Sequence, residues 1–548
     1  MKNIILKKSL VALATSALIA TFAVVIPTTA QAATTCVDKT VLAGKSSIIT
    51  TYAKCVGTDF QGANYEIRMP EKFNGMLFLY SHGLRNEVTI PVLPVLNETG
   101  KPITANREPE VGPNETVNEA LLSQGYAIAG VGGRINGWAV PEVVESNLYL
   151  ILMARDMYPK INKVVSWGDS LGGHISQSLS EKYGVIDATA NIHMAGSAPS
   201  QYAYGGDILW LLKTYFDPTI KGGNYTQPAY AGDTRGYFEF LGDVQKLLVL
   251  LNALSTSIAA NPVTPAWPAT ATTAPAALQG IPVRSAILLI GLLAGIPTQS
   301  KTYDASSGPA GALETTFGVA ISPAVATLEN IGRAIEFIVA VYDTEMKCGG
   351  GIYDNTKTDY ATRIGDNSDV FAAALSGKSA IAGMLAFLNP LNPAAPRFKS
   401  SDASLACLAS QSAYSGKITI PTITLSQTAD PITPPGYVQK LKNDYDDYVS
   451  QGKTKSGLLL NIWQKTPDQY TVFNGLAAVS VPSTKATAGT NHSPFNNDQL
   501  LMLAKMIASS AKSGKLPSMA TAKKAINNDN SLFIDPDYTP TLLPQEAN

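Results

Sequence analysis

The sequence of 548 residues predicts an α/β fold, in which a mainly parallel sheet is covered by helices and interrupted by a large, mostly helical insertion. Two observations lead to this prediction. Short apolar runs typical of buried strands alternate with helical patterns from about residue 65 to residue 200, and the alternation returns over 416–515. Between these stretches the alternation stops, and long apolar helical patterns take its place.

The individual elements follow from these patterns. Strands are expected where short apolar runs end in turn residues, at Tyr65–Pro70, Gly75–Ser81, Gly125–Ala129, Lys163–Trp167, Ala188–Met194, Ile418–Leu425 and Gly457–Trp463. Helices are expected where apolar residues recur with helical spacing, at Val117–Gln124, Glu145–Met157, Val244–Leu254, Val283–Ile296, Ile331–Tyr342, Tyr437–Val449 and Asp498–Ala511, and in a stretch that ends at Tyr183. Within the insertion, 261–278 is rich in Ala, Thr and Pro and is expected to be a flexible connector.

The first 32 residues are expected to be a secretory signal peptide. Lysines near the start precede an apolar run from Ser9 to Ile26, and Ala30-Gln31-Ala32 forms a small-x-small cleavage site. We therefore expect cleavage near Ala32 and an extracellular or periplasmic protein, with an uncleaved membrane anchor as the alternative. No other run reaches the roughly 18 apolar residues of a membrane span, so no stable span is expected.

Five segments result from these predictions. They are the signal peptide at 1–32, the N-terminal part of the α/β domain at 33–200, a helical cap at 201–415, the C-terminal part of the α/β domain at 416–515 and a tail at 516–548.

The four cysteines are expected to form disulfides, because an exported chain folds in oxidising surroundings. Cys36, Cys55, Cys348 and Cys407 allow three pairings, of which short loops favour Cys36–Cys55 and Cys348–Cys407. None of them has the C-x-x-C spacing typical of zinc sites, and no metal site is expected.

The charge composition argues against a nucleic-acid-binding protein. Lys and Arg number 41 against 42 Asp and Glu, so the sequence shows no excess of basic residues for a phosphate backbone. The motifs of zinc proteases, P-loop enzymes and dinucleotide-binding enzymes are absent from the sequence, so no cofactor is expected.

The strongest motif is Gly168-Asp169-Ser170-Leu171-Gly172, a G-x-S-x-G sequence between a predicted strand and a predicted helix. The turn is so tight that its flanking positions require glycine, and it holds Ser170 exposed at the edge of the sheet. The following helix N-terminus favours negative charge beside the serine. Ser170 is therefore the candidate nucleophile, with an inert glycine-rich turn as the alternative.

A serine nucleophile needs a base, and the chain contains only His82, His174, His193 and His492. His492 lies in a loop after the last predicted strand and before the last predicted helix. It alone satisfies the chain order of nucleophile, acid and histidine that accompanies this motif.

The acid is expected after the strand Ile418–Leu425. Asp430 lies there, where its carboxylate could orient the imidazole and stabilise its charged form. Asp402 is the main alternative.

Two backbone N–H groups are expected to form an oxyanion hole. One belongs to Leu171, directly after the nucleophile, and the other to the His82-Gly83-Leu84 turn, with Leu84 as the candidate. The alternative for this turn is a plain strand end with a core histidine.

Together, the HG turn, the GDSLGG motif, Asp430 and His492 resemble the α/β-hydrolase superfamily over about 65–201 and 418–511. The single H-G-L turn is more similar to lipases with a short oxyanion turn than to HGGG esterases. The resemblance implies an α/β-hydrolase fold with a cap over the site, and acyl transfer through an acyl-serine that water resolves.

The sequence departs from the tannase and feruloyl-esterase pattern. In that pattern cysteines flank the catalytic serine and histidine and bridge them, whereas here the neighbours are Asp169 and Ser493.

We expect a secreted hydrolase for small-molecule or polymeric carboxylic esters with apolar or bulky acyl groups, because the cap is apolar and has few charges. The apolar stripes of the cap could form its own core, line an acyl site, or contact a lipid or polymer surface. Two alternatives stay open. One is a serine peptidase of the prolyl-oligopeptidase or tripeptidyl-aminopeptidase type, and the other is a non-catalytic binding protein on the same scaffold.

Overall fold

A computed structural model describes the greater part of the chain. The described residues are 34–43, 48–91, 102–225, 235–303, 320–467, 471, 473–474, 477–478 and 488–546. The predicted signal peptide and its cleavage site lie outside these residues.

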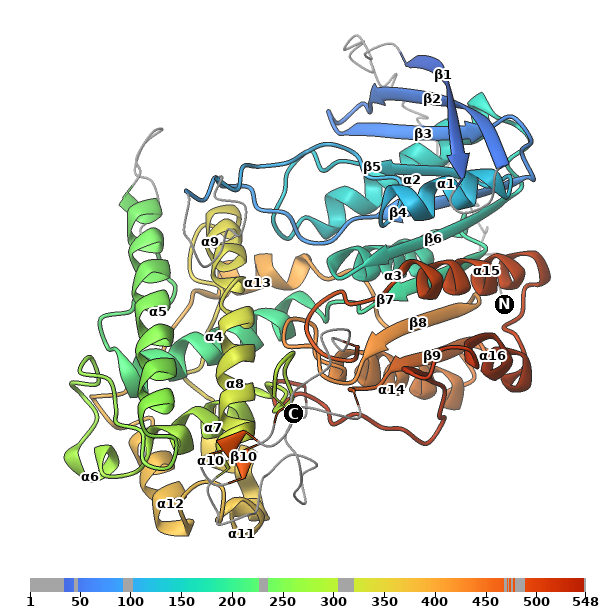
Figure 1. Cartoon of the computed structure of the whole chain (residues 1–548). Helices are drawn as coiled ribbons and strands as arrows, with labels where there is room; N and C mark the ends of the chain where they lie inside the picture. The colour runs from blue at the N-terminus through green and yellow to red at the C-terminus, as the bar shows by residue number, and fades with distance from the viewer. Residues whose placement is uncertain are drawn as a thin grey trace, which may run out of the picture.

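A sheet of ten strands forms one side of the molecule, in the order β1-β2-β3-β5-β4-β6-β7-β8-β9-β12 (Figure 1). The strands are β1 (Thr35–Ala43), β2 (Ile48–Thr58), β3 (Asn64–Pro70), β4 (Met76–Ser81), β5 (Ala127–Val131), β6 (Lys163–Asp169), β7 (Ala188–Ile192), β8 (Thr422–Gln427), β9 (Leu459–Gln464) and β12 (Leu532–Phe533). The six central strands from β5 to β9 are parallel, β1 to β3 extend one edge in antiparallel fashion, and β12 closes the other edge. A separate hairpin pairs β10 (Phe473–Asn474) with β11 (Ala477–Ala478).

Helices cover both faces of this sheet. They are α1 (Glu115–Ser123), α2 (Val140–Met157), α3 (Leu171–Lys182), α14 (Gly436–Ser450), α15 (Asn497–Ser513) and α16 (Met519–Ile526). Every residue of β4 is buried, and its side chains alternate between the two faces. Met76, Phe78 and Tyr80 pack in one core with α1 and α15, whereas Leu77 and Leu79 pack in another with α2 and α3. The strand order and these two layers make the fold α/β-hydrolase-like, which confirms the predicted fold class.

The edge strands β1 and β2 were not predicted, because their sequences carry no continuous apolar run. Val37 and Val56 on these strands are 49% and 38% exposed, so much of this ribbon faces water. Cys36 and Cys55 lie directly opposite each other across the ribbon and are joined by a disulfide, as the short-loop argument favours.

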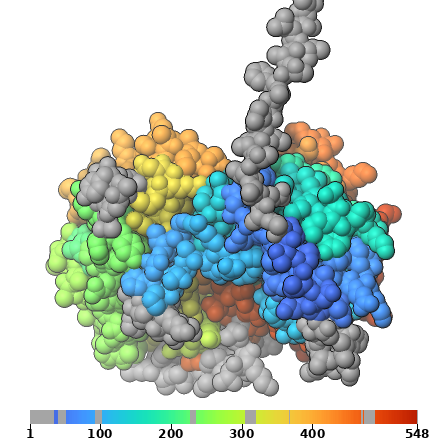
Figure 2. Space-filling model, turned by 90° about the horizontal axis from the view of Figure 1, so that it is seen from above, coloured from blue at the N-terminus to red at the C-terminus, as the bar shows by residue number. Residues whose placement is uncertain are grey.

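The cap is a second lobe of helices beside the sheet (Figure 1). Its helices are α4 (Ala198–Phe216), α5 (Arg235–Ala260), α6 (Ala276–Gln279), α7 (Val283–Ala294), α8 (Ile321–Ala334), α9 (Phe337–Cys348), α10 (Tyr360–Ile364), α11 (Ser368–Phe371), α12 (Lys378–Phe387) and α13 (Asp402–Ser410). Seen from above in Figure 2, the green and yellow cap residues lie on one side of the molecule and the first strands, in blue, on the other. None of the helices that the structure describes has the length and apolar character needed to cross a bilayer.

Two predictions about the cap are corrected by the structure. The single helix expected at Ile331–Tyr342 is the end of α8 and the start of α9. Around Ile335 the main-chain bonds change to the i to i+3 pattern, since the N–H of Ile338 donates to Ile335, and this tighter turn ends α8. The segment 261–278, expected to be a flexible connector, is packed: Trp267 lies against Phe216 and its Nε1 donates to the carbonyl of Ile281.

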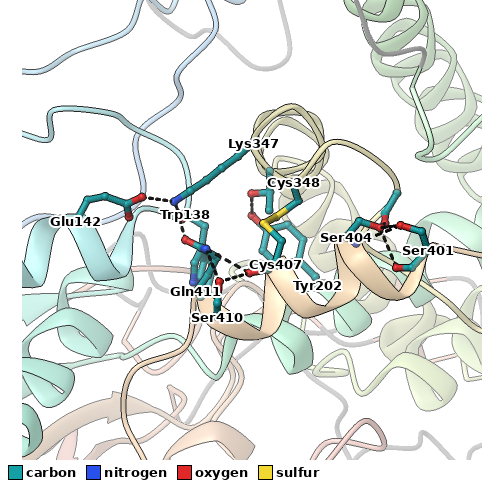
Figure 3. Close-up of a disulfide and its surroundings, with 12 residues drawn as sticks. Trp138, Glu142, Tyr202, Lys347, Cys348, Ser401, Ser404, Cys407, Ser410 and Gln411 are labelled. Carbon is teal, nitrogen blue, oxygen red and sulfur yellow. Dashed lines mark hydrogen bonds and ion pairs between the residues drawn. A yellow bond between two sulfur atoms is a disulfide. The ribbon is translucent and has the colours of Figure 1, made fainter.

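A disulfide and an ion pair hold the part of the cap from which the chain returns to the sheet (Figure 3). Cys348, the last residue of α9, is bonded to Cys407 on α13, the second pairing that short loops favour. Next to it, Lys347 Nζ lies 2.8 Å from the carboxylate of Glu142 on α2 and donates to the carbonyl of Trp138. The cap is therefore joined covalently within itself and electrostatically to the α/β domain.

The C-terminal residues pack between the two lobes. After α16, β12 pairs with β9, and Gln545 Nε2 then donates to Asp207 Oδ2, inside the cap, over 2.6 Å. Asp207 is 1% exposed and is also paired with Arg363. This end of the chain therefore contributes to the core of the cap.

Candidate functional site

The turn that carries Ser170 is formed as the motif predicts, but the prediction that Ser170 is exposed is wrong, because its side chain is buried at 8% exposure. Strand β6 ends at Asp169, helix α3 begins at Leu171, and Ser170 between them has φ 53° and ψ −121°. A positive φ is unfavourable for serine and is typical of strained turns at functional sites. A Cβ at Gly172 would lie 1.9 Å from the carbonyl oxygen of Ser81, and one at Gly168 would lie 2.5 Å from the same oxygen. The two glycines are therefore required for the elbow to pack against the end of β4.

The His82-Gly83-Leu84 turn lies directly beside Ser170. A Cβ built on Gly83 would be 3.4 Å from Cβ of Ser170, which is van der Waals contact. Leu171 is the first residue of α3, where backbone N–H groups lack partners within the helix. Both segments from which the oxyanion donors were predicted thus lie beside Ser170, and the roles of Ser170, Leu171 and Leu84 stay predictions.

The structure brings together the predicted base and the predicted acid. His492 Nδ1 lies 2.9 Å from Asp430 Oδ2 and 3.2 Å from Oδ1. Asp430 is fully buried, and its Oδ1 accepts the N–H groups of Ile432 and Thr433. Asp402, the alternative acid, lies exposed in the first turn of α13 in the cap.

The pKa values of His492 and Asp430 are shifted in opposite directions, as a general base and the carboxylate that supports it require. Burial opposes the charged imidazole, but the carboxylate of Asp430 and its hydrogen bond hold the pKa of His492 above its ordinary value. Burial likewise opposes the charged carboxylate, yet the pKa of Asp430 stays below its ordinary value because His492 faces it.

His492 differs from the other three histidines in this respect. Burial and the charge of Arg85 lower the pKa of His82 to about 4, burial lowers that of His174 to about 4, and burial lowers that of His193 to about 3. Only the pKa of His492 is raised, so the choice made from chain order agrees with the electrostatics.

No hydrogen bond joins Ser170 to His492 within the described residues. Indirect contacts nevertheless bring them to the same place. The N–H of Ser170 donates to the carbonyl of Ile192, and the ring of His193, the next residue, packs against the ring of His492. Such hydrogen bonds are often long in enzymes without substrate and shorten when it binds.

Two residues of the site were missed by sequence reasoning. Asp169 is half-buried beside Ser170, its Oδ1 accepts the hydroxyl of Tyr80 over 2.7 Å, and desolvation raises its pKa. His193 lies just past β7, with its ring centroid 4.4 Å from that of His492. The signal that could have found His193 is the adjacency of parallel strands, since the carboxyl ends of β7 and β8 meet at one edge of the sheet.

Among the described residues, His193, Asp430 and His492 form a group that could hold a metal ion. One ligand atom each from His193, Asp430 and His492 lies within 4.8 Å of the others, and imidazole with carboxylate is a donor set that zinc accepts. His492 and Asp430 already satisfy each other by a hydrogen bond, so the set as it stands fits a catalytic pair.

Solved structures resemble this chain only at low sequence identity. No family model matches the chain, and no curated protein matches it. An esterase from Aspergillus oryzae is similar in structure at 10% identity over 89% of this chain and 88% of its own, with a TM-score of 0.37. Feruloyl esterase B from Aspergillus oryzae gives 11% identity over 89% and 88%, with a TM-score of 0.36. An acylaminoacyl peptidase from Pyrococcus horikoshii gives 11% identity over 31% of this chain and 25% of its own, with a TM-score of 0.20. Scores this low carry no argument about function.

Proposed function

We propose that the protein is a secreted serine hydrolase that cleaves carboxylic esters through an acyl-serine intermediate. The observation that carries the proposal is the hydrogen bond between His492 Nδ1 and Oδ2 of the buried Asp430, next to the strained Ser170 turn. A histidine oriented by a buried carboxylate and set beside a serine at a nucleophile elbow is the arrangement that activates a hydroxyl for acyl transfer.

The reaction then proceeds in two balanced steps. His492 takes the proton of Ser170 while Oγ attacks the ester carbonyl, and the resulting oxyanion is stabilised by the N–H groups of Leu171 and Leu84. The bond to the alcohol breaks as His492 returns the proton to the leaving oxygen. Water then repeats these steps on the acyl-serine, releasing the acid, while Asp430 stabilises the imidazolium each time.

The peptidase alternative has one observation in its favour. The charge of Glu336, at the junction of α8 and α9 in the cap, makes the smallest contribution to the raised pKa of His492, and its side chain is exposed beside Arg333. Such a group could bind the amino group of a peptide. A panel of p-nitrophenyl esters and aminoacyl naphthylamides separates the two activities, since an aminopeptidase would cleave the amides and lose that activity in Glu336→Gln.

The direct test of the proposal is covalent labelling of the serine. A fluorophosphonate probe should label the mature protein and fail to label Ser170→Ala. Ser178→Ala on the same helix is the matched control, because it also removes a buried hydroxyl and should leave labelling unchanged. A wild-type protein that never labels, while remaining folded, would favour the non-catalytic alternative.

The proposed export is tested separately. Peptide sequencing of the protein recovered outside the cell should find Ala33 at the N-terminus, as cleavage after Ala32 requires.

A further inference from the structure

His193 connects the nucleophile turn to the base through its position in the chain. The residue before it, Ile192, accepts the N–H of Ser170 over 2.9 Å, and Ala195 donates its N–H to the carbonyl of Ser170 over 3.1 Å. The main chain around His193 is therefore fixed to both sides of the nucleophile. His193 itself has φ 31°, an unfavourable value that this surrounding structure imposes.

The same residue is fixed to the loop that carries the acid. The N–H of His193 donates to the carbonyl of Leu425 on β8, and its carbonyl accepts the hydroxyl of Thr433 over 2.9 Å. The N–H of Thr433 donates to Asp430 Oδ1, and its hydroxyl lies 3.0 Å from Oδ2. A displacement of His193 would therefore be passed on to the carboxylate.

The ring of His193 packs against the ring of His492, the proposed base. The two rings meet edge to face, with centroids 4.4 Å apart and planes at 77°. The ring of Phe495 stacks on the ring of His193, with their centroids 5.7 Å apart. The side chain is 1% exposed, and neither ring nitrogen has a hydrogen-bond partner among the described residues. What the ring supplies to the site is thus its shape, because its polar atoms are not engaged there.

The imidazole of His193 is also neutral, which matters when His492 becomes charged. The charges of three carboxylates act on His492, namely Asp430 after β8, which contacts it, Asp169 at the end of β6 and Glu336 in the cap. Burial, together with the charge that His492 can carry, lowers the pKa of His193 to about 3. A neutral ring excludes water without repelling the imidazolium.

We propose that His193 is a positioning residue, whose buried ring holds the imidazole of His492 against Asp430 and keeps water out of their hydrogen bond. The inference rests on the proposed function, in which His492 is the base. Because this role depends on the shape of the ring, phenylalanine at position 193 should preserve the function far better than alanine.

The experiment compares His193→Ala and His193→Phe with the wild type by two independent readouts. The first is the strongly downfield proton NMR signal of His492 Nδ1–H, which survives only while the bond to Asp430 is shielded from exchange with water. The second is kcat and KM for an ester, with the rate of fluorophosphonate labelling. We expect His193→Ala to lose the NMR signal and to lower kcat by about 10- to 100-fold with little change in KM, as misplacement of a catalytic group does. His193→Phe should recover the signal and most of kcat.

Leu254→Ala, a truncation in the core of α5 in the cap, is the control for loss of stability without contact to the site. If it lowers kcat as much as His193→Ala, the effect is general loosening and the proposal is wrong. A signal that persists in His193→Ala, or a His193→Phe variant as impaired as His193→Ala, also overturns it. The NMR signal does not depend on catalysis. If the protein proves inactive, the proposed function is contradicted, but the NMR signal still tests whether His193 positions His492.

Discussion

The hydroxyl of Tyr204, on the first helix of the cap, donates a hydrogen bond of 2.7 Å to the carbonyl of Pro431, the residue that follows Asp430. One turn earlier on α4, Gln201 Nε2 donates to the carbonyl of Ile432 over 2.8 Å. Both side chains are buried. The cap therefore takes part in holding Asp430 in place.

The first prediction follows from this contact. Tyr204→Phe removes the hydroxyl and leaves the carbonyl of Pro431 without its donor, so the acid loop should become less well fixed. We expect kcat to fall by about tenfold, because small misplacements of catalytic groups are costly, with a loss of stability of about 1 kcal/mol. Steady-state kinetics and thermal unfolding measure the two effects.

Tyr202→Phe on the same helix is the matched control for Tyr204→Phe. Tyr202 is equally buried, but its hydroxyl donates to the carbonyl of Ala340 and contacts Thr344, both within the cap. It should lose a similar amount of stability and keep its kcat. Equal kinetic losses in the two variants would show that α4 acts on the site only through the general stability of the cap.

The second prediction concerns pH. His492 must be neutral to accept the proton of Ser170, so kcat/KM should rise with pH through the pKa of His492. Because the carboxylate of Asp430 raises that pKa, the midpoint should lie above the ordinary value of about 6.5. Asp430→Asn removes the charge, so any residual activity, lower by about 10³- to 10⁴-fold, should have its midpoint at lower pH. An unchanged midpoint in Asp430→Asn would contradict the pairing.

The Ser170 turn and the position of His492 beside Asp430 were predictable from the sequence because their constraints are local or follow chain order. The glycines beside Ser170 are required by a tight turn, and His492 follows from the order of the last strand and the last helix. Asp169 and His193 were not predictable in this way. Their importance comes from their position beside the other site residues and from the pairing of β6, β7 and β8, which no local pattern contains.

The same distinction applies to the fold. The buried strands were recognised because both of their faces are apolar, as in β4. The ribbon of β1 and β2 was missed because it is half polar, and α4 was missed because it is buried almost all round and so lacks an amphipathic pattern. The break at Ile335 was missed because apolar residues continue across it.

The third prediction concerns the disulfide of the cap. Cys348 and Cys407 are 59 residues apart, whereas Cys36 and Cys55 are only 19 apart. In the loop-entropy account, closing the longer loop constrains the unfolded chain more, with a contribution of about 4 kcal/mol against about 3 kcal/mol. Replacing both cysteines of the cap by serine should therefore lower the free energy of unfolding more than the same change at Cys36 and Cys55. Denaturant unfolding of the two double variants, each fully oxidised at its remaining pair, makes the comparison; an equal or reversed order would contradict it.

The fourth prediction concerns Asp343, a carboxylate that fastens the cap to the α/β domain. Its Oδ2 accepts the N–H of Glu87, its Oδ1 has no partner among the described residues, and burial raises its pKa from 3.8 to about 7. A carboxyl whose pKa is higher in the folded state binds its proton more tightly there. Its favourable contribution is therefore complete below pH ~4 and is lost as the pH rises to about 7. The wild type should lose this part of its stability across that range.

Asp343→Asn tests the assignment, because asparagine keeps the acceptor for Glu87 and cannot ionise. At pH 5 Asp343 is protonated in the folded protein but already ionised in the unfolded chain, so the wild type has lost only part of this contribution and the advantage of the variant should be smaller than at pH 8. At pH 8 the variant should be more stable by about 1–4 kcal/mol, since the wild type must then bury a charge without a counter-ion. Asp369→Asn on α11, which changes the same type of side chain at an exposed position, should show no such dependence. Chemical denaturation at the two pH values gives the result, and a difference between Asp343→Asn and the wild type that does not grow with pH would contradict the raised pKa.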